Sequence, residues 1–244
     1  IASAEPRTRG HSPSRRGGGG DLKILMWDPP TLLHPHFGRG LRDFTASRIF
    51  YEPLAAPTAE GGFVPVLAEE MPSVSSGAVA KDGSWVIWRL KRNVVWHDGA
   101  PFTADDVKFT WELYSHPDNA PGRQIGGFFS RIVGARDFTA GKASEISGIK
   151  VVDPYAIEVT LTEVYAPFLT VSAGQMIMPK HVWKDVPVKQ LGAHPASRSF
   201  PASPSRRTAG TRFARRASNS NASRPTPRAA PILPPCYRHW VKKA

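Results

Sequence analysis

The central part of the sequence, residues 21–190, predicts an α/β fold. Three observations support this class: 24 Pro and 21 Gly among 244 residues are too many for a helical bundle, several segments have strand patterns, and one has a capped amphipathic helix pattern. A content of 41% hydrophobic residues, with 12 Phe and 7 Trp, is enough for a globular core. Because the only cysteine, Cys236, cannot form an internal disulfide, the core must come from apolar burial.

The first expected strand is the apolar run 22–27, which Asp28-Pro29-Pro30 ends. Residues 31–43 are loop-like and contain Gly38-Arg39-Gly40, where the backbone can approach another molecule closely. The segment 45–51 predicts a short helix, because Thr45 is an N-cap candidate and apolar residues follow at helical spacing.

Residues 85–96 predict a hairpin. An apolar run, 85–90, is followed by the polar connection Lys91-Arg92-Asn93 and by the apolar Val94-Val95-Trp96. The tetrapeptide Trp96-His97-Asp98-Gly99 then continues into a turn. A structural role explains this motif without any chemistry, because Asp-Gly is common in turns and the tryptophan is a natural core anchor.

The segment 104–114 predicts a helix that buries one side against a sheet. Thr103 and Asp106 have the spacing of a capping box. The apolar residues of this segment fall on one helical face, and His116-Pro117 ends it. That face consists of Ala104, Val107, Trp111 and Tyr114.

A second hairpin is expected from Ile149–Val152, the turn Asp153-Pro154 and the strictly alternating Ile157–Leu161. No apolar run approaches the roughly 20 residues that cross a bilayer.

The net charge of +12 lies in the two flanks rather than in the centre. Residues 1–20 carry four Arg and one Glu, and residues 192–244 carry nine Arg, two Lys and no acidic residue. The middle, 21–191, has 17 basic and 19 acidic residues. We therefore expect a disordered basic, Gly-rich leader at 1–20, a folded unit at 21–190 and a disordered tail rich in Arg, Ala, Ser and Pro at 191–244.

The basic tail has three interpretations. It is a solvated extension, the translation of GC-rich DNA in the wrong frame, or a nucleic-acid-binding segment. We favour the out-of-frame hypothesis, which the nucleotides after Gln190 would test, and rank nucleic-acid binding last.

The ordered motifs of the centre resemble the family 5 solute-binding proteins of bacterial ABC importers, whose best-known members bind dipeptides and oligopeptides. Seven short motifs follow the order found in that family over about 170 residues. They are 33–36 (LHPH), 46–54 (ASR and YEPL), 65–68 (PVLA), 88–107 (WRLK to DDV), 147–153 (SGI and VD), 166–169 (APFL) and 178–181 (MPKH).

The resemblance implies a mixed-sheet lobe of a periplasmic-binding-protein-like (type II) fold, here incomplete and without the second lobe. It implies a substrate-binding component that captures peptides or similar small polar solutes in the periplasm or another extracytoplasmic space. The implied partners are the ligand and the membrane subunits of the transporter, with neither cofactor nor nucleic acid. The competing hypotheses are a basic nucleic-acid-binding protein and a non-functional gene fragment.

The resemblance places ligand contacts in the loop after the first strand, at Phe37, Gly38, Arg39 and Gly40, where an extended ligand would pair with the backbone. A solvated Gly-Arg-Gly surface loop explains the same residues. Trp27 either lines the cleft or packs in the core.

Metal binding and catalysis are both disfavoured. His34 and His36 are two imidazoles on one loop, but two histidines alone do not complete a metal site. The sequence contains no Gly-x-Ser-x-Gly and no phosphate-binding loop. The acidic pairs Glu69-Glu70 and Asp105-Asp106 are explained as solvated or capping residues, so we expect no enzyme activity.

Overall fold

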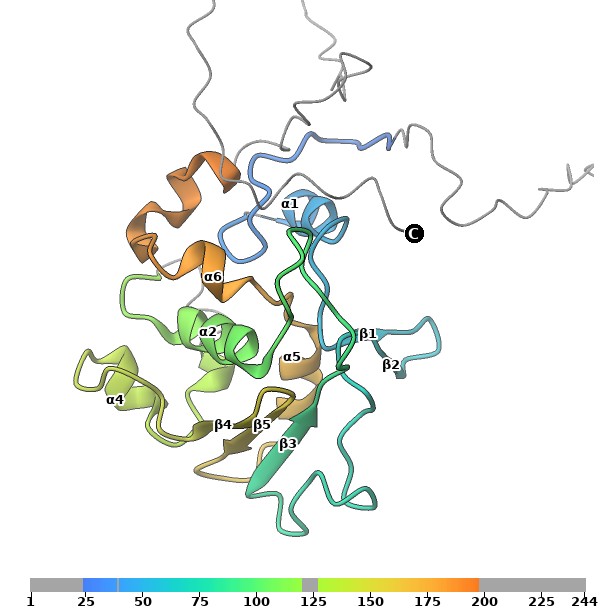
Figure 1. Ribbon diagram of the computed structural model, residues 1–244, viewed down its shortest axis with the longest axis vertical. Coiled ribbons are helices and arrows are strands. Elements are labelled where there is room, and N and C mark those ends of the chain that lie inside the picture. Colours follow the sequence, from blue (N-terminus) through green and yellow to red (C-terminus); the bar gives the residue numbers. More distant parts are fainter. Residues whose placement is uncertain (1–23, 39, 120–126, 198–244) are drawn as a thin grey trace, which may run out of the picture.

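The computed structural model describes residues 24–38, 40–119 and 127–197 (Figure 1). Its helices and strands confirm the α/β class. The expected basic leader, 1–20, lies outside the described residues, as does the expected tail beyond residue 197. The described chain contains no helix long and apolar enough to cross a membrane.

The secondary structure consists of short elements joined by long connections. In chain order they are α1 (Leu41–Ser47), β1 (Ala55–Pro57), β2 (Phe63–Pro65), β3 (Trp85–Arg89), α2 (Ala104–Ser115), α4 (Ala135–Thr139), β4 (Ile149–Asp153), β5 (Ala156–Thr160), α5 (Phe168–Gly174), α6 (Lys180–Trp183) and the 3-10 helices η1 (Val188–Ala193) and η2 (Pro195–Ser197).

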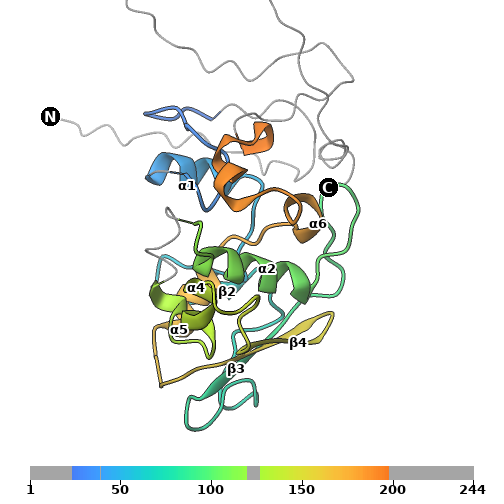
Figure 2. The same ribbon diagram turned by 90° about the vertical axis from the view of Figure 1, so that its left-hand side faces the viewer.

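The main sheet has the strand order β3-β5-β4, and both strand pairs are antiparallel. The alternating side chains of β3 and β5 put Val86, Trp88, Ile157 and Val159 on one buried face. Helix α2 packs on this sheet (Figure 2). Trp111 from the apolar side of the helix is fully buried. These residues form the centre of a large cluster, hereafter the sheet core.

Two predictions made from local patterns are confirmed. The hairpin β4-β5 forms around Asp153-Pro154, with Val151 opposite Ile157. Helix α2 begins directly after Thr103 and ends before His116-Pro117. In both cases the signal lies within one short stretch of chain.

The predicted hairpin over residues 85–96 is wrong. Strand β3 pairs with β5 instead, placing Trp88 opposite Ile157. The segment 94–96 pairs with the chain that follows it, because the Trp96 N–H donates to Ala100 O at 2.8 Å and the Phe102 N–H to Val94 O at 3.1 Å. Buried and partly exposed side chains alternate over five residues in both β3 and β5, so the two strands match along their whole length. The run Val94-Val95-Trp96 is only three residues long and cannot match β3 in this way.

Two predictions near the start of the described chain are also wrong. Residues 24–27 form no strand, and the exposed fractions of Leu25 and Trp27 are 100% and 104%. A buried strand needs neighbours on its edges, and no described strand lies beside this segment. Helix α1 spans 41–47 rather than 45–51, because Gly40 provides the N-cap and the Phe44 N–H donates to Gly40 O at 3.3 Å.

A second, smaller cluster joins the two ends of the described chain. It contains the following buried residues, hereafter the loop core: Phe37, Tyr51, Leu113, Met176, Met178, Trp183 and Leu191. The Leu33 N–H donates to Ser197 O at 2.7 Å, and the segments 24–38 and 180–197 lie side by side in both views (Figures 1 and 2). The described chain ends with η1 and η2, which pack beside the loop that contains Leu33.

The tryptophans allow a test of the sheet core. We expect Trp88→Ala to lower the free energy of unfolding by about 3–5 kcal/mol, because it leaves a large cavity in the sheet core. Trp27→Ala is the matched control and should change it by less than about 0.5 kcal/mol, since its side chain is exposed. Urea unfolding of the 244-residue chain measures both values, and equal effects would contradict this core.

Candidate functional site

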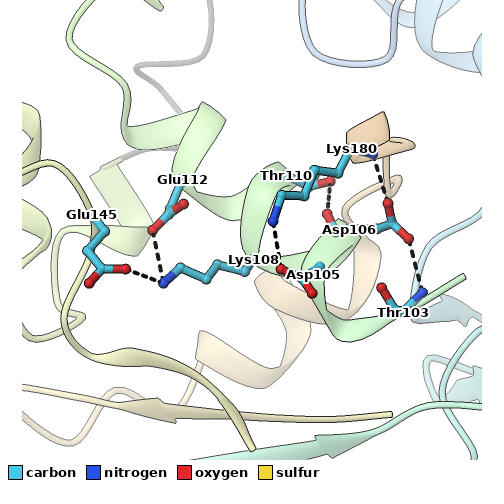
Figure 3. Close-up of polar contacts among 8 residues, drawn as sticks. All are labelled: Thr103, Asp105, Asp106, Lys108, Thr110, Glu112, Glu145 and Lys180. Carbon is cyan, nitrogen blue, oxygen red and sulfur yellow. Dashed lines mark hydrogen bonds and ion pairs between the residues drawn. The ribbon is translucent and has the colours of Figure 1, made fainter. Parts of the chain in front are cut away.

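The carboxylate of Asp106 connects three segments at the N-terminal end of α2 (Figure 3). Its Oδ2 accepts the Thr103 N–H at 3.0 Å, as a capping residue does, and the Trp96 indole N–H at 3.1 Å. Its Oδ1 accepts the Lys180 N–H at 2.8 Å, at the first residue of α6. One buried side chain thus links the 94–102 turn region, α2 and α6.

The protonation of Asp106 reflects two opposed effects. Burial raises the pKa of this carboxyl above its ordinary value, while the N–H groups of Thr103 and Lys180 and the Trp96 indole act in the opposite direction. An ionised carboxylate in this position must keep all three donors, because each of them compensates part of the lost hydration.

Neighbouring contacts strengthen the same junction. His181 Nε2 lies 2.7 Å from Asp98 Oδ2, and Lys180 Nζ lies 2.7 Å from Asp105 Oδ1. Deeper in the structure, the Met178 N–H donates to Thr110 Oγ1 at 2.9 Å. The most recognisable family motifs, WHDG and MPKH, therefore hold each other in place, which agrees with a structural role for the Trp96–Gly99 turn.

A second polar group lies farther along α2. Lys108 Nζ is 2.6 Å from Glu145 Oε2 and 3.7 Å from Glu112 Oε1 (Figure 3). The Ile146 N–H donates to Glu112 Oε1 at 3.1 Å. Burial raises the pKa of Glu112, against the effect of the Ile146 N–H and Lys108. These contacts attach the connection before β4 to the helix, and they too serve the fold.

The two loop histidines are buried. His34 and His36 are 1% and 6% exposed. The Tyr114 hydroxyl is hydrogen-bonded to His36 Nδ1, and it donates to Gln175 Oε1 at 2.7 Å. No group of three or more His, Cys, Asp or Glu within the described ranges could hold a metal ion. The two rings are thus part of the packing between the loop and the 176–194 region.

The structure separates the residues expected to contact a ligand. The Trp27 side chain is fully exposed, whereas Phe37 is 8% exposed and belongs to the loop core. Gly38 donates its N–H to His34 O at 3.1 Å, Arg39 lies outside the described residues, and Gly40 is the exposed N-cap of α1 with φ 92°. Among the four described residues of this set, Trp27 and Gly40 are exposed, Gly38 is half-buried and Phe37 is buried.

A shallow surface depression lies at Gly40 and at Asp28, the residue that follows Trp27. It is lined by Asp28, Gly40, Leu41 and Arg42, and an ion pair between Arg42 and Asp28 crosses it. Sequence reasoning did not select Asp28 or Arg42, because they are 14 positions apart and carry no local motif. A Cβ added at Gly40 would meet no atom within 4 Å, so the chain is open to the outside there.

Comparison with known proteins assigns the chain to a family. The profile described as bacterial extracellular solute-binding proteins, family 5 middle, matches residues 62–225. The chain belongs to this family. The periplasmic oligopeptide-binding protein OppA of Salmonella typhimurium is 31% identical over 133 residues, which are 54% of this chain and 23% of that protein. The periplasmic murein peptide-binding protein MppA of Escherichia coli is 25% identical over 153 residues, 62% of this chain and 27% of that protein.

Solved structures of family members share the fold. The murein tripeptide binding protein MppA of Escherichia coli has a TM-score of 0.57 at 23% identity, over 65% of this chain and 30% of that one. OppA of Burkholderia pseudomallei has a TM-score of 0.53 at 25% identity, over 63% of this chain and 29% of that one. The family 5 chain therefore has part of a periplasmic solute-binding protein fold, and it spans about a quarter of the length of the curated relatives. These relatives are solute-binding proteins rather than enzymes.

Substitution at the α2 junction tests its structural role. Asparagine offers a single acceptor oxygen, so Asp106→Asn must place its NH2 group against at least one of the three N–H donors. We expect the free energy of unfolding to fall by about 1–3 kcal/mol.

The matched control is Asp105→Asn, which loses the exposed pair with Lys180 and a charge in the first turn of α2 and should cost less than about 1 kcal/mol. Urea unfolding at neutral pH measures both variants. A tolerated Asp106→Asn would show that this carboxylate does not organise the junction.

Proposed function

We propose that this chain contributes to the ligand-binding part of an extracytoplasmic peptide receptor that delivers its ligand to an ABC importer. The observation that carries the proposal is the family match over residues 62–225, together with relatives named as oligopeptide-binding and murein peptide-binding proteins. The location follows the same relatives, which are periplasmic. The receptor captures its solute and performs no covalent chemistry.

The mechanism of such a receptor is a population shift. Two lobes close around the ligand, the ligand binds the closed arrangement better than the open one, and the membrane subunits of the importer recognise the closed form. Affinity arises from burial of the ligand by both lobes, so the residues of this chain alone should bind weakly.

Within this chain, the proposed ligand surface runs from Trp27 across the depression to the 37–40 loop. The exposed indole offers an aromatic face, and the positive φ and open surroundings of Gly40 permit close approach of a ligand backbone. Phe37 anchors the loop through its buried ring, so any contact that it makes with a ligand is through the backbone. Arg39 supplies a cation between Gly38 and Gly40 in the sequence.

Peptide titration followed by NMR tests the proposal. We expect unlabelled tripeptides and tetrapeptides, added to the 15N-labelled chain up to about 10 mM, to shift the Trp27 indole and the 37–40 amides with a weak Kd of about 1 mM or above. Trp27→Ala should reduce the shifts of the remaining loop amides.

The control variant is Val164→Ala, which removes another exposed apolar side chain and should leave the titration unchanged. Shifts that map elsewhere would refute the proposed surface. Absence of any peptide-induced shift would contradict a ligand-binding role for this chain.

We also propose that the arginine-rich residues 192–244 are not a nucleic-acid-binding element. The match to a solute-binding family extends to residue 225, and residues 21–191 have more acidic than basic side chains. A fluorescent DNA duplex should bind the chain only at low ionic strength, with a Kd weaker than about 10 µM near 150 mM salt. Tighter binding with a steep salt dependence would favour the nucleic-acid hypothesis.

A further inference from the structure

The loop core contains a cluster of titratable rings that the proposed function does not use. Trp183 of α6 lies between two imidazoles, with centroid distances of 5.1 Å to His34 and 5.3 Å to His194. His36 is adjacent to His34, at a centroid distance of 5.8 Å, and contacts the Tyr114 ring at 4.3 Å. His34 and His194, which are 160 positions apart, thus both contact one tryptophan, and His36 lies next to His34.

Two of these imidazoles are poorly placed to accept a proton. Neither His34 nor His36 has a hydrogen-bond partner for Nε2 among the described residues. His34 Nδ1 accepts the His36 backbone N–H at 3.2 Å, so this nitrogen is used in its unprotonated form. A proton added to either ring would create a buried cation beside other imidazoles.

Neither His34 nor His36 has a carboxylate partner among the described residues. On α1, the Asp43 carboxylate is already engaged: its Oδ1 accepts the Thr31 and Leu32 N–H groups at 2.6 and 3.3 Å, and its Oδ2 accepts the Thr31 hydroxyl at 2.7 Å. On α2, the group that faces His36 is the Tyr114 hydroxyl, whose pKa is raised by burial.

The remaining neighbouring elements contribute cations or neutral groups. On α6, Lys180 and His181 pair with Asp105 and Asp98, away from the loop core. From η1, His194 adds repulsion to His34 and Lys189 pairs with Asp118. In the segment before α6, the Met176 backbone accepts from the His36 ring and raises the pKa of that imidazole, an effect smaller than the lowering by burial.

We propose that the His34–His36 loop is an acid-sensitive clasp, in which protonation of its buried imidazoles opens the loop core while the sheet core stays folded. The loop is attached to the distant end of the described chain through the Leu33–Ser197 hydrogen bond and the Trp183 contacts. Opening would separate the segments 31–38 and 180–197. Helix α2 keeps its sheet contacts through Val107 and Trp111, which belong to the sheet core.

The direction of the pH effect follows from burial. Desolvation lowers the pKa of His36 to about 3 and the pKa of His34 well below its ordinary value. The opened state has ordinary histidines with pKa about 6.5, so it binds more protons below that pH and is favoured there. Between pH 7.5 and 5.5 the opening equilibrium should rise about tenfold for each histidine, or about 100-fold for both.

Hydrogen exchange on the full 244-residue chain without ligand tests the clasp. After correction for intrinsic exchange rates, protection of the Leu33, Gly38 and His194 amides should fall about 10- to 100-fold from pH 7.5 to 5.5. Amides of the β3–β5 pair should keep their protection. Equal loss in both regions, or no loss in the loop core, would overturn the proposal.

Matched variants separate the histidines from other acid effects. His36→Gln retains a hydrogen-bonding side chain beside Tyr114. In this variant the loss of protection between pH 7.5 and 5.5 should be about tenfold smaller than in the wild-type chain. The control His116→Gln removes an imidazole from the end of α2, outside the loop core, and should leave the pH dependence unchanged.

Direct titration does not depend on the folding of any variant. In the wild-type chain, the His34 and His36 ring protons should show no NMR titration between pH 7.5 and 5.5 while the loop core is closed. Titration of either ring near pH 6.5 in the closed state would overturn the proposal. This experiment uses no peptide, so its failure and the failure of the proposed function remain distinguishable.

Discussion

The organisation of the described chain depends on one buried carboxylate. Asp106, in the first turn of α2, accepts the Thr103 N–H, the Trp96 indole N–H and the backbone N–H of Lys180, the first residue of α6. Because all three donors converge on one side chain, hydrogen bonds as well as apolar contacts fix the positions of α2, α6 and the 94–102 turn relative to one another. Apolar burial supplies most of the stability. The buried carboxylate favours the one arrangement of the elements in which all its hydrogen bonds are made.

The two clusters differ in the way the chain builds them. The sheet core joins β3, α2 and the β4-β5 hairpin, and its packing depends on complementary alternation. The loop core brings together residues from both ends of the described chain, and its interior contains histidines as well as apolar side chains. Helix α2 belongs to both, with Trp111 in the first and Leu113 in the second. Disturbing the loop core therefore leaves α2 one intact packing face.

Sequence patterns predicted the elements whose determinants are local. The Thr103–Asp106 spacing identified the start of α2, and alternation around Asp153-Pro154 identified the β4-β5 hairpin. They did not predict partners across long sequence separations: β3 was assigned to the nearby Val94 segment, although it pairs with β5. The apolar run before Asp28 resembled a buried strand, but Leu25 and Trp27 are exposed because apolar content alone does not provide a strand neighbour. For the candidate site, the exposure of Gly40 follows from its role as N-cap, whereas the burial of Phe37 depends on packing against residues beyond 175.

Sequence separation also indicates where the chain should open first. Closing the loop core requires Leu33 to meet Ser197 and His34 to meet Trp183, so it bears a larger loop-closure entropy than the β4-β5 hairpin does. Its interior includes imidazole rings that are costly to bury in charged form, whereas the centre of the sheet core is composed of apolar side chains. Regions with long closures and fewer apolar contacts are those that unfold locally in native proteins. Phe37 belongs to the loop core, so local opening of that core would also release the neighbouring part of the proposed ligand surface.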